Sequence, residues 1–287
     1  MSRNEPTQSP SQYSSSLLME LATRARRVRK ALLRAVCEAG SGHCGGALSI
    51  VEILCALYFH ELRVDPARPC WEQRDRFVLS KGHACAALYA VLAEASFLSD
   101  EWTHKLRRID GSFPGHPDMK GTPGVDMTTG SLGQGISAAV GMALGARLLA
   151  NGARVYCVIG DGESQSGEVW EAAMSAAHYR LDNLVTFLDY NGLQIDGPVV
   201  EVLNIEPVTD KWRAFGWHVL DIDGHDFVQI LGALDEARIT QRRPTIIVAH
   251  TVKGRGVSFM EDAVDYHGKA PGKGELELAL KEVEGQP

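Results

Sequence analysis

Two short apolar runs constrain the fold of this chain more than any other feature. Residues 155–159 read VYCVI and residues 184–188 read LVTFL, and both are rich in β-branched and aromatic side chains. Continuous apolar runs of this length are typical of parallel strands that helices cover on both faces. A Gly-Asp-Gly triplet centred on Asp161 follows the first run, and Asn191 follows the second. We therefore expect Asp161 and Asn191 to lie at the carboxyl edge of one sheet, where open α/β sheets bind ligands.

The residue types at this edge suit a divalent cation bound to a phosphate. Asp161 offers a carboxylate and Asn191 an amide oxygen, and Mg²⁺ takes about six such oxygens, several of them from substrate phosphate. The flanking glycines let the backbone approach a ligand closely, and the start of a helix predicted over 166–180 favours anions. A tight turn followed by an Asx-turn is the alternative interpretation. The succession of strand, aspartate and helix favours a Mg²⁺-diphosphate clamp.

Helical and strand patterns alternate along the rest of the chain. Further strands are expected at 77–79, 218–222 and 245–249, and further helices at 50–62, 137–150 and 227–239. This alternation implies an α/β fold with a doubly wound, mainly parallel sheet flanked by helices. We expect one domain over 17–287, preceded by a flexible tail over 1–16 that is rich in Ser, Pro and Gln. The charged end, 275–287, is expected to be a linker or a cap.

Composition and charge exclude several classes of protein. A chain of 287 residues that is 45% hydrophobic and 23% charged is long enough for a full α/β core. A net charge of −7 argues against nucleic acid or anionic membranes as general partners, and no run approaches the roughly 20 apolar residues of a membrane span. The six cysteines form no C-x-x-C pair, which favours reduced thiols in a cytoplasmic protein over disulfides or zinc.

A cluster of basic residues lies near the start of the chain. It comprises Arg24, Arg26, Arg27, Arg29, Lys30 and Arg34, in a stretch whose apolar residues recur at helical spacing. A nucleic-acid-binding arm is one interpretation. The solvated face of a helix is the other and the simpler interpretation, and we prefer it.

A set of short motifs runs in order from residue 41 to residue 268. They are SGH (41–43), RDRFVLSKGH (74–83), GHP (115–117), TGSLGQG (129–135), GDGESQSGEVWE (160–171), NGLQIDG (191–197), FGWH (215–218), KGRG (253–256) and YHG (266–268). Together they resemble the amino-terminal part of transketolases, and the triplet with Asn191 resembles the thiamine diphosphate motif. The resemblance implies the diphosphate-binding module of the thiamine diphosphate-binding fold. It also implies transfer of a two-carbon ketol unit from a ketose or ketose phosphate to an aldose.

The resemblance also implies the ligands of the metal and of the diphosphate. Mg²⁺, or another divalent cation such as Ca²⁺ or Mn²⁺, is expected on the side chains of Asp161 and Asn191 and on the backbone carbonyl of Leu193. Gly162 would let a backbone amide reach the diphosphate. Lys253 matches a residue near the cofactor, although by itself it would be read as a solvated loop lysine.

Four loop histidines fall within the family motifs. His83 and His267 are expected to contact the cofactor phosphate or the reacting atoms, and His43 and His116 to face the sugar. His43, His116 and His267 are the predicted catalytic residues, because imidazole can move protons near neutral pH. A lone loop histidine is more often a surface residue, but the motifs favour the site. The loop lining the pyrimidine side of thiamine is matched by Gly130, Ser131 and Leu132, with Gly46 near the same surface.

One position departs from the family pattern. Transketolases usually have a glutamate after the Gly-Asp-Gly motif where this chain has Ser166, although Glu171 fits the pattern. In the family such glutamates help to couple the two active sites of a dimer. The departure therefore puts coupling in doubt here, but not metal binding.

The resemblance implies a partner chain. Thiamine catalysis needs a carboxylate on the aminopyrimidine, which the family carries in a separate pyrimidine-binding domain, and no residue after Gly268 matches it. We expect the amino-terminal subunit of a split transketolase, with two copies of each chain in the active assembly. A subunit of another thiamine diphosphate enzyme, such as a 2-oxo-acid dehydrogenase α chain or a deoxyxylulose-phosphate synthase, is one alternative. A non-catalytic phosphate-binding protein is the other.

Overall fold

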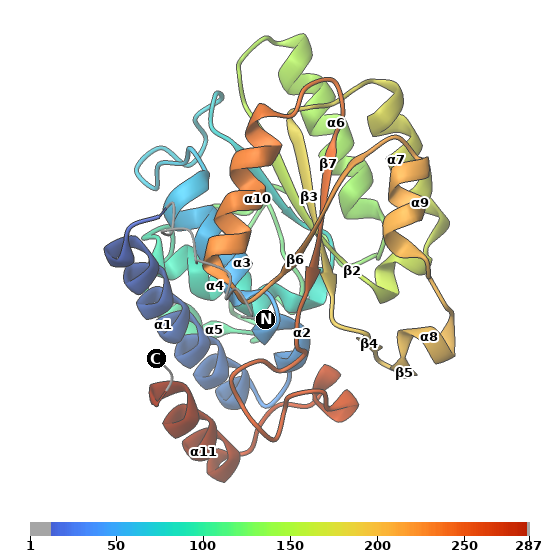
Figure 1. Ribbon diagram of the computed structural model, residues 1–287. Helices are drawn as coiled ribbons and strands as arrows, with labels where there is room; N and C mark the ends of the chain where they lie inside the picture. The colour runs from blue at the N-terminus through green and yellow to red at the C-terminus, as the bar shows by residue number, and fades with distance from the viewer. Residues whose placement is uncertain (1–12, 286–287) are drawn as a thin grey trace, which may run out of the picture.

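Five parallel strands form the central sheet of the computed structural model, which describes residues 13–285 (Figure 1). Their order across the sheet is β1-β2-β3-β7-β6. The strands are β1 (Arg76–Leu79), β2 (Val155–Gly160), β3 (Leu184–Tyr190), β6 (His218–Asp223) and β7 (Thr245–His250). Each contains one of the predicted strands and is one or two residues longer. A separate antiparallel pair, β4 (Leu193–Gln194) and β5 (Gly197–Pro198), follows β3.

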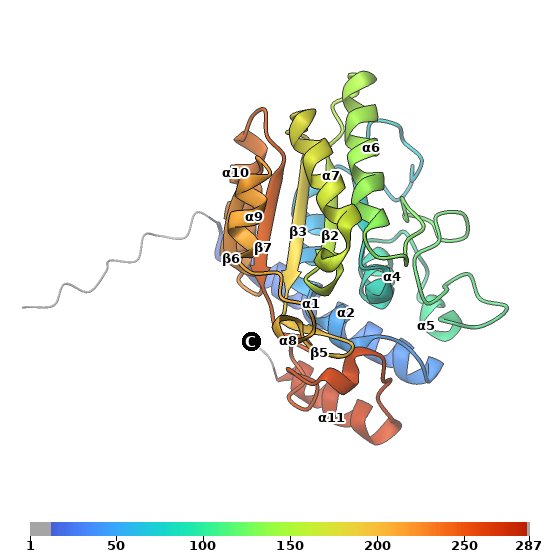
Figure 2. The ribbon, with the colours of Figure 1, turned by 90° about the vertical axis from the view of Figure 1, so that its right-hand side faces the viewer.

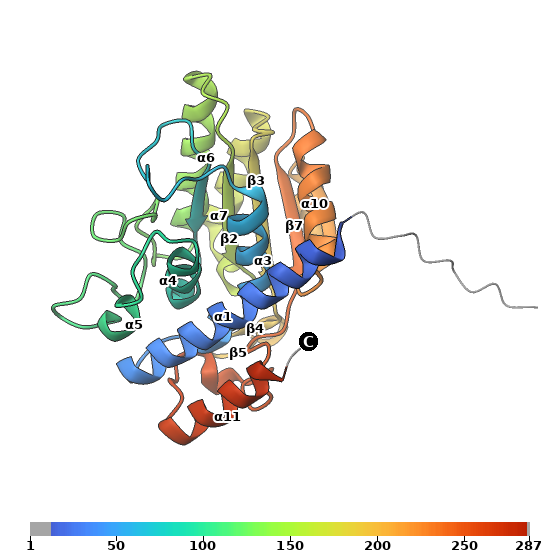
Figure 3. The same ribbon diagram turned by 90° about the vertical axis from the view of Figure 1, so that its left-hand side faces the viewer.

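Helices cover both faces of the sheet, as the apolar strands predicted (Figures 2 and 3). They are α1 (Ser15–Ala39), α2 (Cys44–Leu48), α3 (Val51–Ala56), α4 (Cys85–Glu94), α5 (Trp102–Lys105), α6 (Gln134–Leu148), α7 (Gly167–His178), α8 (Val199–Val202), α9 (Val208–Ala214), α10 (Phe227–Ile239) and α11 (Lys273–Glu284). Short 3-10 segments occur at η2 (Gly82–Ala84), η3 (Gly162–Gln165) and η4 (Val264–His267). Helices α6, α7 and α9 lie over one face, and α3, α4 and α10 over the other, with α1 crossing outside them.

The order of the strands explains which helix lies on which face. From β1 to β3 the chain adds strands in one direction, whereas the step from β6 back to β7 runs in the opposite direction. Because crossovers between parallel strands are right-handed, α7 and α10 must lie on opposite faces. The order reverses between β3 and β7, and such switch points are where doubly wound sheets bind ligands.

Alternate residues of each strand belong to two separate cores. In β2, Tyr156 and Val158 pack into the core shared with α1, α3, α4 and α10. Their neighbours Cys157 and Ile159 pack into the core shared with α6 and α7. Burial of both sets is the reason why the strand is continuously apolar instead of alternating with polar residues.

Three predicted helices differ from the observed ones in their ends. The helix expected over 50–62 consists of α3 followed by a π-helix, η1 (Leu57–Glu61). The helix expected over 137–150 begins earlier, at Gln134, directly after Gly133 with φ +90°. The helix expected over 166–180 is α7, which ends at His178.

The basic stretch near the start forms α1, and one prediction about it was wrong. Arg27 and Arg34 are exposed, as a solvated face requires, but Arg29 is only 3% exposed and pairs with Glu52. Arg29 lies four residues after the buried Ala25, on the stripe that packs against the core. Helix α1 begins at Ser15, inside the predicted tail, while residues 1–12 lie outside the described part of the chain.

The other predictions concern the end of the chain, its thiols and membranes. Of the expected linker or cap, the described residues form part of α11, which packs against α1 and pairs Glu284 with Lys30. All six cysteines are free thiols. Within residues 13–285, no helix combines the length and apolar character of a transmembrane span.

Candidate cofactor site

The loops after β1, β2, β3 and β7 meet at the carboxyl edge of the sheet around a small cavity. Its volume is about 110 Å³. Nine residues predicted from the sequence are in its wall, namely Gly46, His83, Leu132, Asp161, Gly162, Asn191, Leu193, Lys253 and His267. The strand register accounts for this convergence, because Gly160 at the end of β2 pairs with Asp189 near the end of β3. The predicted placement of Asp161 and Asn191 at one edge is confirmed.

Asp161 is buried and holds two neighbouring loops together. Its Oδ1 accepts a hydrogen bond from the amide of Gly162 at 2.7 Å, and its Oδ2 accepts one from the amide of Gly192 at 2.6 Å. Burial, and then the nearby carboxylate of Asp189, raise the pKa of Asp161 to about 6, although the two amides oppose this shift. Burial and Asp189 thus disfavour the charged form of Asp161, and a cation placed against the carboxylate would stabilise that form.

The other two predicted metal ligands come from the segment directly after β3. The Asn191 Nδ2 donates to Asp189 Oδ2 at 2.8 Å, and its Oδ1 accepts from the amide of Leu193 at 3.1 Å. The carbonyl of Leu193 accepts a hydrogen bond from Lys253 Nζ at 3.1 Å. All three candidate ligands therefore offer oxygen, which fits a hard cation such as Mg²⁺. No cluster of three His, Cys, Asp or Glu side chains suited to a metal occurs in residues 13–285.

A buried ion pair between Lys81 and Asp189 lies in the wall of the cavity, and sequence reasoning missed it. Lys81 is 1% exposed and Asp189 is fully buried. Asp189 also accepts hydrogen bonds from Ser49, Thr251 and Asn191. Burial alone would raise the pKa of Asp189, but Lys81 and these donors lower it below its usual value. A charged Asp189 fixes the Asn191 side chain, so the pair orients a candidate metal ligand.

The four predicted histidines gather beside the cavity. Ring centroids are 5.0 Å apart for His83 and His267, 5.4 Å for His43 and His83, 5.6 Å for His43 and His267, and 6.3 Å for His43 and His116. Burial and nearby cationic groups lower all four pKa values, that of His43 to about 4 and that of His267 to about 3. These imidazoles are therefore neutral near pH 7.

The hydrogen bonds of two histidines define what each can do. Nδ1 of His267 lies 2.9 Å from Lys253 Nζ, so it accepts from the ammonium and its proton is on Nε2. His43 Nδ1 is buried and has no hydrogen-bond partner in the described part of the protein. Such an atom is costly to leave unpaired and is available to a ligand.

The glycine loops let backbone approach the histidines closely. Gly130 has φ +149°, and a Cβ there would lie 3.0 Å from Cδ2 of His116. A Cβ at Gly46 would lie 3.3 Å from Nε2 of His83. Leu132 is in the cavity wall, whereas Gly130, Ser131, His43 and His116 are not.

Glu163 is another buried residue that sequence reasoning missed. One of its carboxylate oxygens accepts from Ser80 Oγ and from the Gly133 amide at 2.9 Å, and the other accepts from the Gly160 amide at 3.0 Å. It thus ties together the loops after β1 and β2 and the start of α6. A carboxylate directly after the Gly-Asp-Gly triplet was the available signal.

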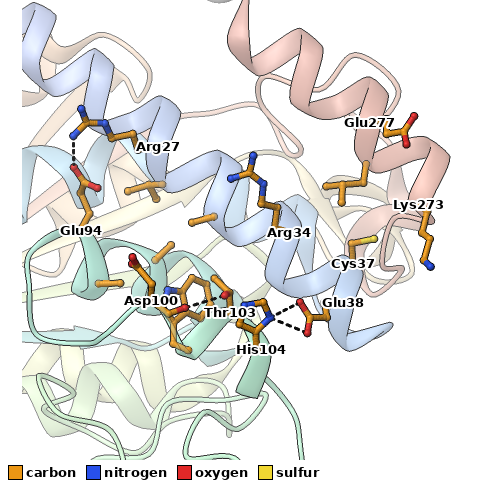
Figure 4. A pocket seen from close by; sticks show the side chains of 16 residues that line it. Arg27, Arg34, Cys37, Glu38, Glu94, Asp100, Thr103, His104, Lys273 and Glu277 are labelled. Carbon is orange, nitrogen blue, oxygen red and sulfur yellow. Dashed lines mark hydrogen bonds and ion pairs between the residues drawn. The ribbon is translucent and has the colours of Figure 1, made fainter.

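A larger hollow of about 950 Å³ lies elsewhere, between α1, α4, α5 and α11 (Figure 4). Several charged residues in its wall are paired with each other, including Arg27 with Glu94 at 3.1 Å and His104 with Glu38 at 2.8 Å. It contains none of the predicted site residues. Its size alone therefore does not make it the candidate site.

Comparison with known proteins also indicates a domain that binds thiamine diphosphate. Residues 22–286 match the family model of the transketolase, thiamine diphosphate binding domain. The 6-deoxy-6-sulfo-D-fructose transketolase subunit SqwG of a Clostridium strain is 49% identical, with 87% of this chain and 90% of that protein aligned. An apulose-4-phosphate transketolase subunit of Phocaeicola vulgatus is 41% identical, with 92% of this chain and 93% of that protein aligned.

Longer transketolases match over part of their length. Among solved structures, transketolase from Leishmania mexicana superimposes with a TM-score of 0.89 at 31% identity, covering 92% of this chain and 41% of that one. For transketolase from Campylobacter jejuni the TM-score is 0.86 at 34% identity, covering 95% and 43%. This chain thus spans about two fifths of these solved proteins. The chain belongs to the transketolase family and corresponds to its amino-terminal, thiamine diphosphate-binding part.

Proposed function

We propose that this chain holds Mg²⁺ and thiamine diphosphate and, together with a second subunit, transfers a two-carbon ketol unit from a ketose or ketose phosphate to an aldose. The observation that carries the proposal is the convergence of Asp161, Asn191, the Leu193 carbonyl and His267 on one cavity, with His43 beside it at 5.6 Å from His267 between ring centroids. Two relatives that align over nine tenths of their length are named as transketolase subunits. Their names give different sugars, so the substrate proposed here is no narrower than a ketose.

In this proposal the metal is held by Asp161, Asn191 and the carbonyl of Leu193. Lys253, which donates to that carbonyl, would yield it to the cation and turn toward the diphosphate. The buried Nε2 of Gln194, which has no hydrogen-bond partner among residues 13–285, is a further donor in the same wall. Other divalent cations with oxygen preference, such as Ca²⁺ or Mn²⁺, would suit the same ligands.

The bound cofactor would supply stabilisation of the two-carbon carbanion. The protein would supply binding, orientation and proton movement. Neutral His43 can accept a proton from a sugar hydroxyl or donate a hydrogen bond to a carbonyl, and His267 presents an Nε2–H donor. His83 and His116, together with Gly46 and the loop over Gly130, Ser131 and Leu132, would line the cofactor and substrate.

Replacing either His43 or His267 with alanine is expected to lower turnover by roughly 10²-fold or more in the reconstituted enzyme. Cofactor affinity should fall far less, because neither residue is a proposed metal ligand. Steady-state rates and cofactor titrations measure the two quantities separately. His104→Ala is the matched control, because His104 is an exposed histidine paired with Glu38 outside the site. Turnover equal to the wild type would reassign both residues as ordinary loop histidines.

The proposed partner carries the pyrimidine-binding domain, and two copies of each chain would form the active assembly. The outer face of α6 supports self-association, because Gly141 is exposed and Leu148 is 79% exposed there. Met174 on the adjacent α7 is 54% exposed. An apolar face of this kind is stabilised by burial against a second copy.

Gly141→Lys is expected to convert a self-associated form of the chain into a monomer. A side chain at Gly141 meets no atom within 4 Å, so the fold itself has room for the substitution. Gly232→Lys on α10 is the matched control, because that glycine also has open space around it. Sedimentation velocity would measure the oligomeric state of both variants. A Gly141→Lys variant that remained a dimer would place the contact elsewhere.

Two observations would decide between this function and its alternatives. Activity with ketose donors rather than pyruvate separates a transketolase from a 2-oxo-acid dehydrogenase α chain or a deoxyxylulose-phosphate synthase. Titration of thiamine diphosphate with and without Mg²⁺ separates all of these from a non-catalytic phosphate-binding protein. We also propose a cytoplasmic location, which the six free thiols support.

A further inference from the structure

A buried network of hydrogen-bonded polar side chains connects α1, α3 and the loop after β6. Arg29 Nη2 lies 2.5 Å from Glu52 Oε1, and Glu52 Oε2 lies 3.0 Å from Nδ1 of His225. The side chains of these three residues are 3%, 9% and 9% exposed. Burial would raise the pKa of Glu52, but Arg29 and His225 lower it to about 2. Buried ion pairs add little net stability, so their presence calls for another explanation.

Both ends of this network hold the loop that follows β7. His225 Nε2 accepts a hydrogen bond from the Val252 amide at 2.8 Å, and Arg29 Nε donates to the Arg255 carbonyl at 3.2 Å. Because Nε2 accepts a hydrogen bond, the ring hydrogen is on Nδ1, which donates a hydrogen bond to Glu52 Oε2. The two contacts lie on either side of Lys253.

Lys253 is the residue by which this loop reaches the cofactor site. It is 2% exposed, and its Nζ lies 3.1 Å from the Leu193 carbonyl and 2.9 Å from His267 Nδ1. Gly254 next to it has φ +83°, and its amide donates to the Gly45 carbonyl at 3.0 Å. The loop is therefore held by His225 and Arg29 on one side and by Gly45 on the other, and Lys253 reaches from it into the site.

We propose that Glu52, Arg29 and His225 are positioning residues that act on cofactor binding through Lys253. Glu52 is the centre, because it sets the tautomer of His225 and the orientation of Arg29 at the same time. Loss of these contacts would free the backbone on both sides of Lys253, so its ammonium would no longer be held at the edge of the cofactor site. The inference rests on the proposed function for the identity of the cofactor, but its effect on the loop can be measured without any cofactor.

The test uses the full chain with His225→Phe, which keeps a ring but removes both hydrogen bonds, and with the milder Glu52→Gln. In the absence of cofactor, hydrogen exchange at the amides of 252–256 should accelerate in both variants. The dissociation constant for thiamine diphosphate with Mg²⁺ should rise by about tenfold, as is typical when supporting residues around a metal site are lost. In a Lys253→Met background the same substitutions should raise this dissociation constant by less than about a further twofold. The effects of residues that act through one another do not add.

His218→Phe is the matched control. His218 also pairs with a glutamate, Glu236, at 2.9 Å, but it lies at the opposite end of β6. The His218→Phe substitution should change neither the hydrogen exchange of the amides of 252–256 nor the affinity for the cofactor. Thermal unfolding verifies that each variant is folded, and Glu52→Gln replaces His225→Phe should the latter not fold.

Three outcomes separate the inference from the proposed function. Unchanged exchange over 252–256 in the folded variants would overturn the positioning role. So would an affinity loss that persisted undiminished in the Lys253→Met background, because the network would then act by another route. A wild-type chain that bound no thiamine diphosphate even with its partner subunit present would refute the proposed function, while the exchange measurement would still decide whether the network holds the loop.

Discussion

Asp161→Ala is expected to abolish Mg²⁺-dependent binding of thiamine diphosphate, with a loss of at least about 10²-fold in affinity. Removal of one member of a buried pair of opposite charges typically costs about 2–5 kcal/mol. Here the carboxylate is the only anionic side chain among the proposed ligands, and it lies 3% exposed at the edge of the sheet. Without it, the cation would face Asn191, a carbonyl and the diphosphate alone. Isothermal titration with and without Mg²⁺ measures the effect.

The variant needs a control because Asp161 also supports the backbone. Its two oxygens accept hydrogen bonds from the amides of Gly162 and Gly192. Loss of a buried acceptor lowers the free energy of unfolding by about 1–3 kcal/mol for each group left unsatisfied. Asp161→Asn removes the charge and keeps the side-chain shape, and its one oxygen can still accept from one of the two amides, so it preserves more of the backbone support than alanine does. We expect Asn to retain the fold while still losing Mg²⁺-dependent affinity. A folded Asp161→Ala protein with wild-type affinity would contradict the metal assignment.

The second large effect is expected on assembly. Purified to homogeneity, this chain should bind thiamine diphosphate weakly and catalyse no ketol transfer, and activity should appear when a pyrimidine-domain partner is added. The proposed contacts of this chain hold the diphosphate end of the cofactor. Without a partner, the thiazolium would be exposed to water and would lack a carboxylate on its aminopyrimidine, so the preorganised electrostatic environment would be missing.

The measurement is a steady-state assay with a ketose phosphate donor and an aldose acceptor, before and after addition of the partner. Cofactor affinity should rise on the same addition, because binding to the assembled form draws on contacts from both chains. A chain carrying Asp161→Ala is the control, since it should remain inactive with the partner present. Robust turnover by the isolated wild-type chain would refute the split-enzyme proposal.

Elements that carry a strong local pattern were predictable from the sequence. The five strands were placed to within one or two residues, because apolar runs bounded by turn residues have few alternatives in a globular chain. Helix ends were less predictable. The π-helix at Leu57–Glu61 and the early start of α6 after Gly133 depend on how the helices pack and on one residue with positive φ.

The basic stretch shows the limit of charge patterns. Arg27 and Arg29 are two positions apart and look equivalent in the sequence, yet one is exposed and the other is buried. Their difference depends on the direction in which α1 presents its apolar stripe and on Glu52 of α3, which pairs with Arg29. No local rule could have supplied that partner.

The carboxyl-edge site was predictable from the strand pattern alone, because parallel strands end at the same edge whatever their order, so Asp161 and Asn191 had to lie there. The tertiary structure decided which charges are buried around it and how they are paired. Lys81 meets Asp189 and Lys253 meets the Leu193 carbonyl across long stretches of chain. Such contacts leave no periodic signal in the sequence, because they depend on which strands become neighbours and on which loops those strands bring together.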